Sequence, residues 1–121
     1  MKKYLITLTI ILVLACSAND VPKGILSERE ITPILVDIHL AEGLYAQRYA
    51  QKITRDNYAE DLYMSVLKKY KVSQKTLEAS LLYYGKYPEK YKPVYDEVLD
   101  RLNEMNVKMR AKDSIQNLKK R

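Results

Sequence analysis

The chain has 121 residues, with 21 basic and 15 acidic side chains and a formal net charge of +6. This length is enough for one modest domain. Because the chain contains one cysteine, an intramolecular disulfide and a multi-cysteine metal site are both excluded.

The first sixteen residues have the pattern of an export leader. Lys2 and Lys3 precede an uncharged, mostly apolar run of twelve residues that ends at Ala15, and Cys16 follows directly. A run of twelve is shorter than the roughly 20 residues that cross a bilayer as a helix. We therefore expect residues 1–15 to be a signal peptide that is removed, not a retained membrane span.

The string from Val13 to Cys16 resembles the bacterial lipobox. That resemblance implies that the cysteine sulfur carries diacylglycerol, that the chain is cut before the cysteine, and that the new amino group is acylated. Two or more acyl chains make a lasting membrane anchor. The alternative is an ordinary secretory leader in which Cys16 is incidental.

Residues 16–24 follow as a polar lipidated tether that ends in a turn around Pro22 and Gly24. Only Asp20 is acidic among the residues just after Cys16, so we see no strongly acidic export tag. We expect an anchor in the outer membrane that faces the periplasm.

Charge is distributed unevenly along the expected mature chain. Residues 108–121 contain six basic side chains and only Asp113 to oppose them, a net charge of +5, whereas residues 16–107 sit at −1. Outside the cytoplasm, a basic tail is expected to meet anionic lipid headgroups, acidic glycans or an acidic partner instead of nucleic acid.

The periodicity of residues 25–107 is helical almost throughout and predicts an all-α domain, a small bundle of about four helices.

Two starts compete for the first helix. Residues 27–30 fit a capping box, but Pro33 would then remove a backbone bond inside the helix. Thr32 as the cap avoids that cost. We therefore expect a short helix or turn at 27–31 and a main helix at 33–52.

The second and third helices have clearer signals. The second is expected to start near Thr54 or Asp56, either of which can cap it, and to end near Tyr70. Ser73 is a good cap for the third helix, which we expect Gly85 to stop.

The fourth helix has two candidate starts, at Pro88 and at Pro93. No glycine or proline follows Pro93, so we expect a long helix that continues into the basic tail, residues 108–121. Its apolar stripe repeats at intervals of four and three through Tyr91, Tyr95, Val98, Leu102, Met105 and Met109.

Several strings give the chain a resemblance to small Bacteroidetes-type lipoproteins built on an uncharacterised all-helical domain. The strings are Pro22-Lys23-Gly24-Ile25-Leu26-Ser27, Ile34-Leu35-Val36-Asp37-Ile38-His39-Leu40-Ala41-Glu42, Tyr83-Tyr84 and Val94-Tyr95-Asp96-Glu97-Val98-Leu99-Asp100-Arg101-Leu102. The resemblance spans about residues 21–102. It implies a lipoprotein with a helical fold and no particular chemistry.

Asp37, His39 and Glu42 are the one candidate polar site. His39 and Glu42 are three residues apart and share a helix face, whereas Asp37 projects from elsewhere on the turn. A metal would need further ligands from other helices. With a single histidine in the chain, the plainer interpretation is that His39 is a partly buried polar residue, hydrogen-bonded at the edge of the helix interface, with Asp37 and Glu42 as helix-surface or inter-helix partners. We expect no metal and no cofactor.

Tyrosine supplies every aromatic ring, and five of the eleven tyrosines fall within thirteen residues. They are Tyr83, Tyr84, Tyr87, Tyr91 and Tyr95, with Lys86, Lys90 and Lys92 among them. These rings suit either the rim of a small core, with the hydroxyl groups in water, or a candidate binding surface for peptide or sugar.

Three functional classes follow. The favoured one is a membrane-anchored envelope lipoprotein with a non-catalytic helical interaction or scaffolding module and an envelope protein or glycan as partner. The second is an envelope enzyme or ligand-binding protein that uses Asp37, His39 and Glu42, although no catalytic residue can be assigned and no nucleophile elbow or phosphate loop is present. The third is a nucleic-acid binder with a helix-turn-helix, which export from the cytoplasm argues against.

Overall fold

A computed structural model describes residues 21–53 and 55–120, which form four helices and no strand. The helices are α2 (Glu28–Ala50), α3 (Tyr58–Tyr70), α4 (Gln74–Lys86) and α5 (Pro88–Lys119). This confirms the predicted all-α fold of about four helices with a long C-terminal helix. The expected signal peptide and Cys16 lie outside the described residues.

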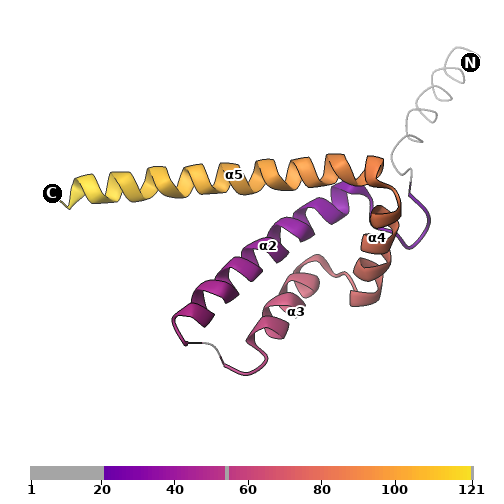
Figure 1. Cartoon of the computed structure of the whole chain (residues 1–121), viewed down its shortest axis with the longest axis horizontal. Coiled ribbons are helices and arrows are strands. Elements are labelled where there is room, and N and C mark those ends of the chain that lie inside the picture. Colours follow the sequence, from indigo (N-terminus) through magenta and orange to yellow (C-terminus); the bar gives the residue numbers. More distant parts are fainter. Residues whose placement is uncertain (1–20, 54, 121) are drawn as a thin grey trace, which may run out of the picture.

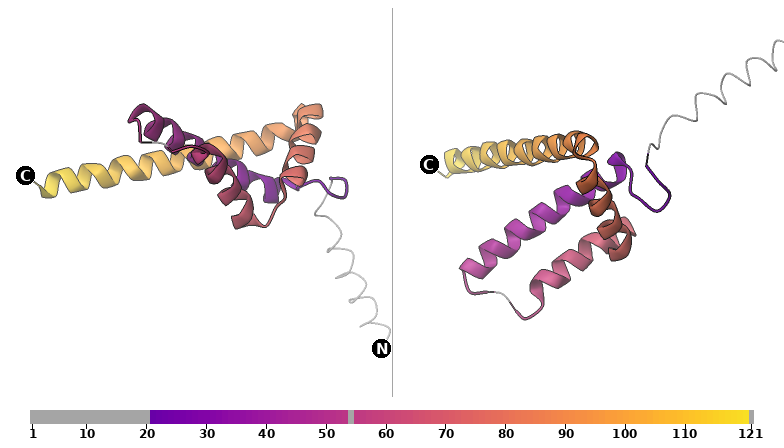
Figure 2. Two further views of the ribbon diagram at one scale, coloured as in Figure 1. Left: turned by 90° about the horizontal axis from the view of Figure 1, so that it is seen from below. Right: turned by 45° about the vertical axis from the view of Figure 1, so that its right-hand side comes forward.

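Helix α3 lies antiparallel beside α2, α4 stands across one end of this pair, and α5 runs back from that end over the body (Figure 1). The right-hand view of Figure 2 shows that α2 and α5 start close together and then diverge, and the left-hand view shows that the two helices cross at an angle. The molecule is therefore closed at the α4 end and open at the other.

The core lies at the closed end, where all four helices contribute. Its buried apolar residues are Leu26, Ile31, Ile34, Leu35, Val36, Val66, Leu67, Leu77, Tyr84, Val94 and Val98. Tyr84 is the only aromatic ring in this set, because the other tyrosines near it keep part of their surface in water. The fold thus depends on aliphatic packing around one buried tyrosine.

The expected start of the first helix at Thr32 is wrong, since α2 is continuous from Glu28. The Ser27 N–H and hydroxyl both donate to the Glu30 carboxylate, at 2.8 and 2.7 Å. This local bonding fixes the start of the helix. Pro33 leaves the Arg29 carbonyl without its helical partner, but Arg29 is exposed and water can replace the missing donor.

Other helix ends differ by a few residues. Helix α3 starts at Tyr58 after Asn57, which adopts a left-handed conformation, and not at Asp56 or Thr54; Thr54 is outside the described residues. Ser73 caps α4 as predicted, since its hydroxyl accepts the Thr76 N–H.

Gly85 does not stop α4, which continues to Lys86. Because the ring of Pro88 disfavours the helical conformation for the residue before it, α4 ends and α5 starts at this proline. The second candidate start, Pro93, lies inside α5.

Helix α5 leaves the body after Leu102, the last of its residues that is packed against the core. Every described residue after Leu102 is exposed. Within the described part of the chain, no helix combines the length and apolar character that a bilayer crossing requires.

Candidate functional site

The segment before α2 is held to α4 by two buried hydrogen bonds. The Leu26 N–H donates to the Ser80 hydroxyl at 2.9 Å, and the Tyr84 hydroxyl donates to the Leu26 carbonyl at 3.0 Å. Ser80 in turn donates to the Thr76 carbonyl. These bonds satisfy both backbone groups of Leu26 and fix where the N-terminal segment enters the body.

The five predicted tyrosines form one chain of ring contacts, here called the tyrosine ladder. Its centroid separations are 4.9 Å for Tyr87–Tyr83, 5.5 Å for Tyr83–Tyr84, 6.5 Å for Tyr84–Tyr91 and 5.8 Å for Tyr91–Tyr95. All these distances lie within the usual range for aromatic pairs. The structure therefore brings together all five members across α4 and α5.

The ladder is buried in the middle and exposed at both ends. Tyr84 is 2% exposed, whereas Tyr87 and Tyr95 are 42% and 44% exposed. The Lys90 ammonium lies 5.8 Å from the Tyr83 ring centre. Burial, and to a lesser extent the negative charge of Glu28, raise the pKa of Tyr84. Tyr84 thus has a structural role, and the ends of the ladder are the part available to a partner.

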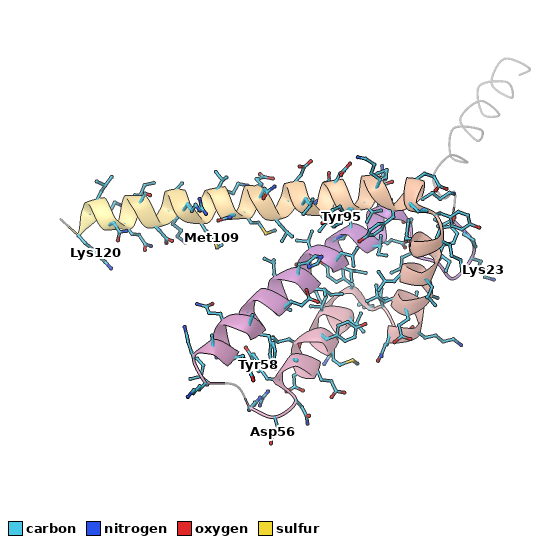
Figure 3. All side chains as sticks on the ribbon, viewed as in Figure 1. Lys23, Asp56, Tyr58, Tyr95, Met109 and Lys120 are labelled. Carbon is cyan, nitrogen blue, oxygen red and sulfur yellow. The ribbon has the colours of Figure 1, made fainter. Side chains whose placement is uncertain are left out.

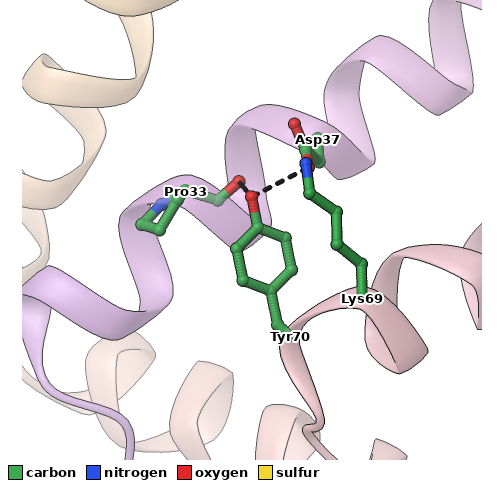
Figure 4. A network of polar contacts seen from close by, with 4 residues as sticks. All are labelled: Pro33, Asp37, Lys69 and Tyr70. Carbon is green, nitrogen blue, oxygen red and sulfur yellow. Dashed lines mark hydrogen bonds and ion pairs between the residues drawn. The ribbon is translucent and has the colours of Figure 1, made fainter.

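Asp37 belongs to a polar network between α2 and α3 (Figure 4). Its carboxylate accepts the Tyr70 hydroxyl at 2.8 Å and the Lys69 ammonium at 2.6 Å. The Tyr70 hydroxyl also lies 3.3 Å from the Pro33 carbonyl. With one proton to give, the hydroxyl bonds mainly to the nearer carboxylate.

Electrostatics in this network favour the charged carboxylate. Partial burial acts to raise the pKa of Asp37, but the hydrogen bonds from Lys69 and Tyr70 and the Lys69 charge outweigh it and leave that pKa lowered. Burial and then the hydrogen bond to Asp37 raise the pKa of Tyr70. Asp37 is therefore an ionised helix-to-helix partner and is not a poised acid or base.

His39 and Glu42 form a separate, exposed pair, so the expected partial burial of His39 at the helix interface is wrong. The Glu42 carboxylate lies 3.2 Å from the His39 Nδ1 atom, and the two side chains are 46% and 68% exposed. Asp37 turns toward α3 instead, so the structure divides the three candidate residues between two places. Within the described residues, no three His, Cys, Asp or Glu side chains gather as a set that could hold a metal ion.

Two hollows adjoin the helices. A small apolar cavity of about 240 Å³ lies between α2 and α3, with Glu42 at its edge. Its other lining residues are Ile38, Ala41, Tyr45, Ala59, Leu62 and Tyr63. It is smaller than the 300–1,000 Å³ typical of ligand pockets.

The second hollow is an open cleft of about 570 Å³ between the start of α2 and the first half of α5. Its lining includes four acidic residues, Glu28, Asp96, Glu97 and Asp100, and two basic residues, Arg29 and Arg101. Within the described residues, no buried side-chain nitrogen or oxygen lacks a hydrogen-bond partner.

No local sequence pattern indicates Ser80, Lys69 or Pro33 as partners in these networks. Ser80 bonds to Leu26 across 54 positions, and Asp37 and Lys69 are 32 positions apart. Periodicity places Tyr70 on the buried side of its helix, but no local pattern shows which residue lies opposite.

The comparisons with known proteins bear on the helical body. A family described as a domain of unknown function (DUF4296) matches residues 22–108. No curated protein and no solved structure matches the chain.

Proposed function

We propose that this chain, a member of the DUF4296 family of domains of unknown function, is a lipid-anchored envelope protein whose helical domain binds a partner without catalysing a reaction. The observation that carries the proposal is the position of Cys16. It is the only cysteine, it follows an apolar leader, and Leu26, the first buried residue in the part of the chain that the structure describes, comes ten positions later. At about 3.3–3.6 Å per residue, this tether lets the body stand roughly 35 Å or less from its anchor.

The hydrogen bonds of Leu26 support this arrangement. Because both of its backbone groups are bonded to α4, a pull on the tether is resisted by the closed end of the bundle, where the core lies. The family match likewise starts at residue 22, after the leader and Cys16.

Lipidation is tested by the mass of the mature protein. Membranes that express the full chain should yield an N-terminus at Cys16 that carries three acyl groups. Cys16→Ala should abolish the added mass and the processing, whereas Ser17→Ala should leave both unchanged. A mature chain that begins elsewhere, or that carries no lipid mass, would overturn the proposal.

The exposed ends of the tyrosine ladder are the proposed interaction surface. Tyr87 and Tyr95 each leave part of an apolar ring exposed to water, and Lys86 and Lys92 lie on the same stretch of chain. Such surfaces suit an envelope protein or a glycan, since rings supply contact area at a low cost in side-chain entropy.

Photo-crosslinking in intact membranes tests this surface. A photoreactive residue at position 87 or 95 should give the same adduct, and one at Tyr49, which is 65% exposed but lies outside the ladder, should not. Adducts at all three positions, or at none, would contradict the assignment. For a glycan, tyrosine emission provides a second readout, because the chain has no tryptophan.

The alternatives have less support. A ligand-binding or catalytic site made of Asp37, His39 and Glu42 conflicts with the separation of Asp37 from the other two. A nucleic-acid partner conflicts with the proposed export. We place the anchor in the outer membrane with the body in the periplasm, and digestion of the body by protease added to whole cells would overturn that placement.

A further inference from the structure

The second half of α5 is a helix with no core beneath it. From Asn103 to Lys120 every residue is exposed, and Figure 1 shows this half extending away from the other helices. Figure 3 shows side chains extending from both edges of this part of the ribbon, where Met109 and Lys120 are labelled. Helical segments of this length are marginal in water without packing partners, so a surface that covers one side of it would stabilise it.

Four of its apolar residues lie along one side, whereas Met105 and Met109 lie on the opposite side, in line with the face of α5 that packs on the body. Val107, Ala111, Ile115 and Leu118 follow at intervals of four, four and three, which places them in one row on a helix. Val107, Ile115 and Leu118 are 67%, 54% and 71% exposed. We call this row the tail stripe.

The tail stripe does not continue the side of α5 that packs on the body. That side carries Val94, Val98 and Leu102. At about 100° per residue, the centre of the tail stripe lies roughly 145° around the helix axis from the centre of that set. The stripe is therefore a separate apolar surface and is not an extension of the core.

Positive charge borders the tail stripe. Lys108, Lys112 and Lys119 stand on one flank and Arg110 on the other, while the single acid, Asp113, lies roughly opposite the stripe. Lysine and arginine beside an apolar row can keep their heads in the headgroup layer while their stems cover apolar surface. The arrangement is that of an interfacial amphipathic helix.

The basic character is confined to this end of the helix. Residues 95–107 contain four acids and one base, whereas residues 108–120 contain five bases and one acid. The two equal stretches thus carry net charges of −3 and +4. A surface that attracts the second stretch repels the first, so contact is limited to the end of α5.

We propose that residues 107–120 of α5 are a second membrane-contact element, which lies in the headgroup layer of an anionic phospholipid surface with the tail stripe facing the lipid. The proposal rests on the proposed lipid anchor for its setting in the cell, where the anchor keeps a bilayer close to the tail; in solution, an excess of vesicle lipid takes the place of that anchor. A tether at Cys16 raises the local concentration of the bilayer around the tail.

Site-specific fluorescence tests the contact. In the full-length Cys16→Ser chain, which holds no other cysteine, an environment-sensitive dye is attached at Ile115→Cys or at Gln116→Cys. Position 115 lies on the tail stripe and position 116 faces away from it. With phosphatidylcholine vesicles that contain phosphatidylglycerol, the dye at 115 should shift to the blue and be quenched by a lipid-borne quencher, and the dye at 116 should respond several-fold less.

Charge is tested in the same assay. Substitution of Lys108, Lys112 and Lys119 by glutamine should remove the response at 115, as should high salt or pure phosphatidylcholine. The same substitution at Lys23, Lys68 and Lys75, three exposed lysines of the body, should leave it unchanged.

Three results would overturn the proposal: equal responses at 115 and 116, no response with anionic vesicles, or a blue shift at 115 that appears without vesicles and rises with protein concentration. The last would show that a second copy covers the stripe. None of them depends on acylation, so the mass of the mature N-terminus separates a failure of this inference from a failure of the lipid anchor.

Discussion

The first and second halves of α5 form one continuous helix, but different interactions hold them. In the first half, Val94 and Val98 are almost completely buried against α2 and α4. In the second half, Leu118 is 71% exposed, and the interactions are local, such as the 2.7 Å ion pair from Lys108 to Glu104. Burial thus stabilises the body, whereas the free end has surface to offer to something else.

The largest expected contrast is between a core leucine and a tail leucine. Leu77 is fully buried, so Leu77→Ala should lower the free energy of unfolding by about 2–5 kcal/mol through lost burial and a new cavity. Leu118→Ala, the same chemical change at an exposed site, should stay within about 0.5 kcal/mol. Urea denaturation followed by circular dichroism measures both.

Equal losses in the two leucine variants would break the comparison, since the tail would then contribute to the core of the body. If Leu77→Ala fails to fold, Val98→Ala removes less volume from the same core and keeps the comparison measurable.

The next contrast concerns the two kinds of tyrosine in the ladder. Tyr84→Phe should cost about 1–3 kcal/mol, because the buried Leu26 carbonyl loses its donor. Tyr95→Phe, at a ring that is 44% exposed, should have little effect on stability. Thermal melts of the two variants measure the difference. Similar melting temperatures would contradict the conclusion that the Tyr84 hydroxyl stabilises the fold and the Tyr95 hydroxyl does not.

The apolar stripe of the fourth helix shows how far periodicity can predict the fold. The sequence pattern continues evenly to Met109, but burial ends at Leu102 because α2 diverges from α5 beyond that point. A repeat in one helix identifies its apolar face and cannot show where the partner helix ends. The predicted stripe also does not contain Val94, which is fully buried in the structure. A repeat in one helix therefore does not identify every residue that its partner helices cover.

The candidate site shows a second limit. The grouping of the five tyrosines could be predicted because they are close in sequence, with four of them on α4 and α5 and Tyr87 between the two helices. The bonds from Leu26 to Ser80 and from Asp37 to Tyr70 join distant positions and depend on how the helices cross. The start of α2 could not be predicted, because the free-energy cost of Pro33 inside the helix depends on whether water can reach the Arg29 carbonyl. Only the fold determines that exposure.

A smaller effect is expected at Asp37, which is 21% exposed and lies between the two extremes. Asp37→Asn should cost about 1 kcal/mol at neutral pH, since the amide keeps a weaker bond to Tyr70 and loses the ion pair with Lys69. Guanidinium or urea denaturation at pH 7 measures this loss, with Glu42→Gln as an exposed control on the same helix.

The pH dependence of the Asp37 contribution follows from its lowered pKa. Because the folded-state pKa is below the unfolded value of about 4, the stabilisation is complete above that value and is lost as the pH falls through the folded-state pKa. Wild-type protein should therefore lose stability more steeply than Asp37→Asn below about pH 4. Parallel curves for the two proteins would exclude this role for the carboxylate.

The smallest effect is expected at Lys108, and it separates stability from function in the tail. Lys108 and Glu104 are 72% and 64% exposed, and such i,i+4 pairs contribute little because water screens them. Lys108→Gln should therefore leave the denaturation midpoint unchanged within error. The same variant, combined with those at Lys112 and Lys119, should remove the vesicle response of the tail stripe. If the triple variant lost stability together with vesicle contact, these lysines would stabilise the helix itself. The positive charge at the end of α5 would then be explained without contact to a lipid surface.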